Sequence, residues 1–187
     1  MHTLEPHDSD QVNRFKQFVA AEVKVAKDHS IEPKKVLAEW RTHLESLYKI
    51  IDSAMAPYIK AGSVELTDQE ISINEPRIGT YTAKKIVLKI GSKEVSFVPI
   101  GTNLIAAKGR VDITGPSGTA KIVLVDAQAL KPNIRVTIKV KGENEDPPED
   151  CAPVAWAWKL ASPPPTIRYT ELNEATLLQS IMEVANG

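Results

Sequence analysis

The chain has 187 residues, of which 42% are hydrophobic and 25% charged, and its net charge is -1. Such a chain is long enough to form one globular domain with its own core, and its near-zero charge argues against a strong general nucleic-acid binder. A single cysteine, Cys151, excludes an internal disulfide. No signal segment and no apolar run of the ~20 residues that a membrane helix needs is visible, so we expect a soluble, cytoplasmic protein without a membrane anchor.

The first third of the chain has the apolar spacing of helices. One stripe consists of Val12, Phe15, Val19, Val23 and Ala26. A longer stripe follows, consisting of Leu37, Trp40, Leu44, Leu47, Ile51 and Met55. We expect Ser30 to cap the second helix, Pro33 to lie in its first turn, Pro57 to end or kink it, and Gly62 to stop it.

The middle of the chain alternates apolar and polar residues with the period of strands. The predicted strands cover about residues 64–73, 80–90, 94–100, 104–114, 120–126, 134–140 and 154–158. Short turns such as Gly91-Ser92 join them without intervening helices, which predicts an antiparallel meander. A last helix is predicted after an N-cap at Asn173, with Leu172 and Leu177 at the spacing of a hydrophobic staple.

Together these elements predict an α+β fold. An antiparallel sheet of about six to seven strands, arranged as a meander, is flanked by an N-terminal helical region and a C-terminal helix. The helical region is expected to cover residues 1–62, and the sheet with its helix residues 63–187. We expect both to pack as one domain, in which the Trp40 stripe and the last helix cover the apolar face of the sheet.

Charge is distributed unevenly along the chain. Residues 1–76 carry a net charge of -4, residues 77–121 carry +6, and residues 122–187 carry -3. The polar faces of the predicted strands carry Lys85, Lys89, Lys108, Arg110, Lys121, Arg135 and Lys139. If these faces align, they form a cationic surface for a protein or another anionic partner, including a phosphate ligand or nucleic acid. A solvated lysine face that discourages edge pairing is the alternative.

Nucleic acid is the less favoured partner, because Tyr81 is the only aromatic residue on the strand face of Lys85 and Lys89. Trp156 and Trp158 share a face of the last predicted strand, where they serve either as core anchors or as an exposed platform.

No enzymatic motif is present. The four histidines lack metal-ligand spacing, so neither a metal site nor a cofactor is predicted. Residues 115–121 lack the Gly-Lys-Ser/Thr ending of a phosphate loop. Cys151 follows Glu149 and Asp150, which disfavour its thiolate, and residues 142–153 are predicted to form an acidic linker.

The sequence leaves three functional hypotheses open. The first is a non-catalytic binding or interaction protein that uses the cationic sheet face or an apolar helix surface, either for a partner or for another copy of itself. The second is binding of nucleic acid or a phosphate ligand by the same basic face. The third is a small enzyme with its site in a cleft between helix and sheet.

Overall fold

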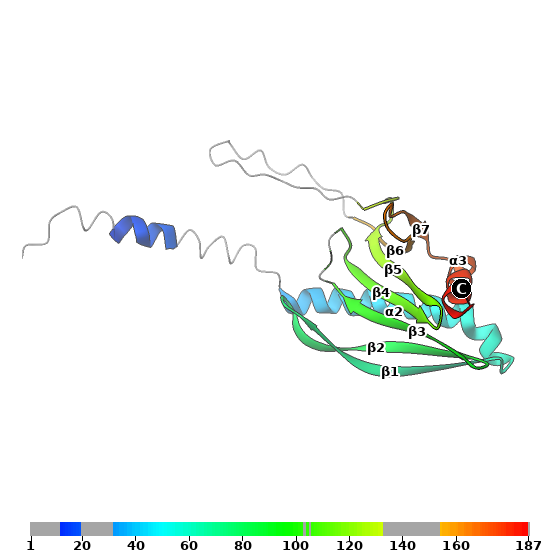
Figure 1. Cartoon of the computed structure of the whole chain (residues 1–187). Helices are drawn as coiled ribbons and strands as arrows, with labels where there is room; N and C mark the ends of the chain where they lie inside the picture. The colour runs from blue at the N-terminus through cyan, green and yellow to red at the C-terminus, as the bar shows by residue number, and fades with distance from the viewer. Residues whose placement is uncertain (1–11, 20–31, 103, 105, 133–153, 187) are drawn as a thin grey trace, which may run out of the picture.

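The computed structural model describes residues 12–19, 32–102, 104, 106–132 and 154–186. Its centre is one seven-stranded antiparallel sheet in which the strands lie in sequence order (Figure 1). The strands are β1 (Val64–Glu75), β2 (Gly79–Ile90), β3 (Lys93–Gly101), β4 (Gly109–Gly115), β5 (Gly118–Asp126), β6 (Trp156–Ala161) and β7 (Tyr169–Glu171). Residues 12–19 are helical, α2 spans Pro33–Lys60, and α3 spans Glu174–Asn186. The predicted α+β meander between helical ends is therefore confirmed.

The strand predicted at 134–140 lies outside the described residues, and β5 pairs directly with β6. The three residues of β7 were not predicted, because so short a strand has no measurable period. Its place is set by the ladder with β6, from Ala161 opposite Tyr169 to Lys159 opposite Glu171.

The long helix α2 carries the predicted stripe on its buried side, from Trp40 to Met55. Its ends differ from the prediction. The N-cap is Glu32, whose side chain makes no capping bond, so the expectation of a Ser30 cap was wrong. Pro57 neither ends nor breaks the helix, which continues to Lys60. Pro57 is exposed, so water can hydrate the carbonyl that its missing N–H leaves free, and Gly62 stops the helix at φ +70°.

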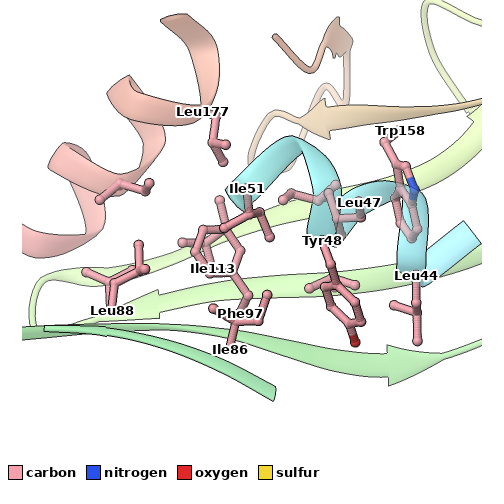
Figure 2. Packing of buried hydrophobic residues seen from close by; sticks show 14 of the residues in the cluster. Leu44, Leu47, Tyr48, Ile51, Ile86, Leu88, Phe97, Ile113, Trp158 and Leu177 are labelled. Carbon is pink, nitrogen blue, oxygen red and sulfur yellow. The ribbon is translucent and has the colours of Figure 1, made fainter. Parts of the chain in front are cut away.

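Both helices contribute to a single core on one side of the sheet. Leu47, Ile51 and Leu177 meet the inward side chains of the strands, among them Phe97 and Ile113 (Figure 2). The predicted N-cap of α3 is confirmed, because the amide of Thr176 donates to Oδ1 of Asn173 at 3.0 Å. Full burial of each large apolar side chain contributes about 1.5–3 kcal/mol, so this core supplies most of the driving force for folding.

The β1–β2 ribbon turns over along its length. Its pairing is unbroken from Val64 to Glu75, yet Leu66 packs on the core near one end and Ile73 near the other. Residues 66 and 73 alternate to opposite sides of a strand, so the ribbon must present opposite faces to the core at its two ends. Tyr81, the register partner of Ile73, is consequently buried at 7% exposure, and its predicted place beside Lys85 on the wet face was wrong.

The close approach of Gly109 to α2 gives a stability test. A Cβ atom on Gly109 would lie 2.2 Å from the ring of Trp40, whereas one on Gly91 meets nothing within 4 Å but carries a φ of +60°. Gly109→Ala is expected to lower the free energy of unfolding by about 3 kcal/mol through overpacking, and Gly91→Ala by only about 1 kcal/mol through backbone strain. Urea unfolding monitored by tryptophan fluorescence measures both, and equal losses would contradict this packing.

Candidate functional site

The structure describes five of the seven predicted cationic site residues; Arg135 and Lys139 lie outside the described residues. Lys85, Lys89, Arg110 and Lys121 each alternate with inward-facing residues of their strands. Their side chains therefore lie on the side of the sheet away from α2 and α3, which we call the open face. The structure brings these four residues to one face, as predicted from their alternation.

Lys108 does not belong to this group. Its Nζ lies 2.7 Å from Oε2 of Glu39 on α2 and 4.9 Å from the ring centroid of Trp156. It precedes the first residue of β4 and follows Ala106, whose φ is +62°, so the strand alternation does not extend to it. The expectation that Lys108 shares a strand face with Arg110 was therefore wrong.

Carboxylates neutralise part of the open face. The guanidinium of Arg110 donates Nε–H and Nη2–H to the two oxygens of Asp112, each at 2.6 Å, and this hydrogen-bonded pair raises the pKa of Arg110. Lys89 lies in register between Glu65 on β1 and Glu94 on β3.

Lys85 and Lys121 differ from Arg110 and Lys89 in the residues that lie in register with them. Lys85 lies in register with Gln69, and Lys121 lies opposite Asp112, whose oxygens already accept from Arg110. Within the part of the chain that the structure describes, neither ammonium group has an ion pair or a hydrogen bond. Lys89 has no ion pair among these residues either, but two glutamates flank it in register, whereas Lys85 and Lys121 have no available carboxylate in register.

A strap of residues 127–130 restricts the open face at β6. Lys159, exposed by only 3%, donates from Nζ to the carbonyls of Ala127 at 2.7 Å and Ala129 at 2.9 Å. The carbonyl of Leu130 then accepts the N–H of Tyr169 at 2.9 Å. This buried lysine holds the strap across β6. Val123 and Val125 of β5, on the same face, are also buried, whereas Lys85 and Lys121 are partly exposed.

A second cluster was missed by sequence reasoning. Glu39 and His43 lie one turn apart on α2, and Lys108 reaches them from the segment before β4, beside Trp156 on β6. Burial lowers the pKa of His43, and the positive charge of Lys108 lowers it further against the opposing effect of Glu39. The hydrogen bond and charge of Lys108 also lower the pKa of Glu39. The four-residue spacing of Glu39 and His43 was the only sequence signal for this cluster, since its other members are distant in the chain.

This cluster combines a neutral imidazole, an ion pair and an indole. Trp156 is 39% exposed, whereas Trp158 is buried and donates Nε1–H to the carbonyl of His43 at 3.0 Å. The predicted pair of tryptophans thus divides into one core anchor and one partly exposed ring. The hydroxyl of Ser46 adjoins the cluster, where it donates to the carbonyl of His43 at 2.7 Å and accepts from Nε1 of Trp158 at 3.2 Å. The ion pair beside a partly exposed indole is suited to contact with a ligand or partner.

A groove lies between α3 and the ends of β5 and β6. It has a volume of about 800 Å³, and its titratable described lining residues are Lys121 and Glu183. Hydroxyl groups also line it, from Ser117, Thr119, Ser162, Thr170, Thr176 and Ser180. Several of these hydroxyls are already engaged, because those of Thr176, Ser180 and Ser162 donate to nearby backbone carbonyls. The groove offers polar contacts, but no hydroxyl paired with a base.

Among the described residues, no three His, Cys, Asp or Glu side chains gather closely enough to hold a metal ion. The described helices include none with the length and apolarity to cross a membrane. Comparison with protein-family models, with curated proteins and with solved structures found no match. Any functional statement therefore rests on the geometry of the chain itself.

The Glu39–His43–Lys108 cluster gives a pH prediction. Because the pKa of His43 in the folded chain lies below the ordinary 6.5, this group stabilises the fold fully above about pH 6.5, and the contribution declines as the pH falls below it. Lys108→Met removes the repelling charge and is expected to raise the pKa of His43 and to reduce this loss.

Proton NMR titration of the imidazole measures the pKa directly, and urea unfolding at about pH 5 and about pH 7.5 measures the stability. Lys89→Met, on the open face, is the matched control and should leave His43 unchanged. An unaltered His43 titration in Lys108→Met would contradict the proposed contact.

Proposed function

We propose that this protein is a non-catalytic binding protein that holds an acidic partner protein on the open face of its sheet. The observation that carries the proposal is the pair Lys85 and Lys121, which lack ion-pair partners among the described residues and lie on the side away from both helices. Acidic side chains of a partner would supply the missing counter-charges.

The arrangement of charge favours an acidic protein over nucleic acid. The cations of the open face are interspersed with Glu65, Glu94 and Asp112, which would repel the continuous charge of a phosphate backbone. Separate carboxylates on a protein can avoid such positions. An aromatic stacking platform is also weak, because Tyr81 turns into the core.

The remaining aromatic support comes from β7. Tyr169 lies opposite Ala161, which is itself the register partner of Lys121, so Tyr169 is on the open face two strands from that lysine. One half-buried ring does not provide the successive stacking positions that single strands use. Nucleic acid therefore stays the second partner class for this face.

A small enzyme is a second candidate function, favoured by the groove beside α3. Glu183 of α3 lines it, and Lys121 of β5, whose side chain is on the open face, borders it. The volume of about 800 Å³ is sufficient for a small substrate. The amide of Gln179 donates to Glu183 at 2.9 Å, which orients the carboxylate. The groove lacks a paired nucleophile and base, and we therefore rank binding first.

The binding proposal is tested with a fluorescent polyglutamate peptide as the acidic probe. Lys85→Gln/Lys121→Gln should bind it about tenfold more weakly than the unaltered protein, since two charge pairs are lost. Lys34→Gln/Lys49→Gln removes the same charge from exposed positions on α2 and should bind like the unaltered protein. Fluorescence anisotropy gives the affinities.

Additional probes separate the partner classes. Oligo(dT), oligo(U) and inorganic phosphate are titrated at about 50 mM and about 200 mM salt, over which phosphate-backbone binding should fall steeply. Salt-sensitive binding of the oligonucleotides, tighter than that of polyglutamate, would favour nucleic acid instead. Equal polyglutamate affinities for the two double variants would overturn the role of Lys85 and Lys121.

A further inference from the structure

The two edge strands of the sheet differ in length and in whether their outer side is covered. At one edge, β7 has only three residues, and Leu130 already occupies the N–H of Tyr169. At the other edge, β1 has twelve residues, and its pairing with β2 continues without a register shift. Short strands and covered edges prevent unwanted strand addition, so only the β7 edge is blunted in this way.

The outer side of β1 is open over most of its length. Within the described residues, the backbone hydrogen bonds of Val64–Asn74 go to β2 alone. The exposed side chains along this stretch are Glu65, Thr67, Asp68, Gln69, Glu70, Ser72 and Asn74. The strand contains neither proline nor lysine, and no bulge interrupts it, so the usual structural obstacles to strand addition are absent.

The charge of this edge is wholly negative. Asp68 has an ion pair with Lys84 at 3.6 Å, whereas Glu65 and Glu70 have none among the described residues. The β1–β2 ribbon turns over between its ends, and both glutamates are on its exposed side. Residues five apart in a strand are separated by roughly 17 Å. A strand that pairs with β1 would therefore meet two unpaired carboxylates at that spacing.

We propose that the outer edge of β1 binds an extended, basic peptide segment of a partner protein by strand addition. The main chain of the peptide supplies hydrogen bonds to the outward N–H and C=O groups of β1, and two Lys or Arg residues five positions apart pair with Glu65 and Glu70. This site shares Glu65 with the rim of the open face, where Glu65 lies in register with Lys89, but it does not depend on the function proposed for Lys85 and Lys121.

A second copy of this chain fits the middle of the edge, residues 67–70, poorly. A symmetric antiparallel pair of β1 strands must place one residue opposite itself. Centring the pair on Asp68 or on Glu70 sets like charges face to face, and centring it on Gln69 sets Asp68 against Glu70 of the other copy. Centring the pair on Thr67 places the apolar side chain of Leu66 opposite the carboxylate of Asp68. A basic segment from a different protein avoids all of these conflicts.

The probe is a synthetic peptide, Thr-Val-Lys-Val-Thr-Ile-Thr-Lys-Val-Thr, which carries its lysines five positions apart. It should bind the full chain, and Glu65→Gln/Glu70→Gln should weaken that binding about tenfold. Glu45→Gln/Asp52→Asn removes the same charge from exposed positions of α2 and should leave the affinity unchanged. A peptide with both lysines replaced by glutamate should fail to bind.

Backbone pairing has its own signature. Successive N–H groups of a strand point to opposite sides, so only every second N–H group of the peptide can bond to β1. N-methylation of the odd-numbered peptide residues and N-methylation of the even-numbered ones should therefore differ: one set should abolish binding and the other should spare it. Equal losses of affinity for the two N-methylated peptides would overturn strand addition and leave only charge attraction. In the contrary outcome, the chain sediments as a dimer that substitutions in β1 abolish, and it fails to bind the peptide. That outcome would assign the edge to a second copy and overturn the proposal.

Discussion

The burial of the α2 stripe against one side of the sheet is the constraint on which the remaining structure depends. Trp40, Leu47 and Ile51 are almost completely inaccessible, and they meet strand residues that are equally buried. Covering this side leaves the other side of an alternating strand toward solvent. The open face and its lysines are therefore a consequence of where α2 packs.

A buried polar contact accompanies the turning of the β1–β2 ribbon. Glu75 is 5% exposed, and its carboxylate accepts from the hydroxyl of Tyr81 at 2.5 Å and from the amide of Thr102 at 2.9 Å. These bonds join the end of the ribbon to the segment after β3, while the β2–β3 ladder ends at Ile86 opposite Phe97. Because a buried carboxylate is stable only with such partners, this contact helps to specify how the ribbon wraps over the core.

The same twist connects the two proposed surfaces. Because the ribbon turns over, β1 keeps apolar contacts at both ends while its outer edge stays free along the middle. The lysines of β2 lie toward the open face or beside the carboxylates of β1, as Lys84 does with Asp68. The chain thereby places an acidic strand edge beside a face with unpaired cations, and partners of opposite charge could bind at the two places.

Periodicity alone was sufficient to predict most of the architecture: the α2 stripe, the strand order of the meander, and α3 with its Asn173 cap. These features depend on neighbours within a few residues, as does the alternation that places Lys85, Lys89, Arg110 and Lys121 on one face. Tertiary packing decided the burial of Tyr81, the pairing of Lys108 with Glu39, and the short strand β7. Each of these results from the twist of the ribbon or from contacts between distant segments, neither of which a local pattern contains.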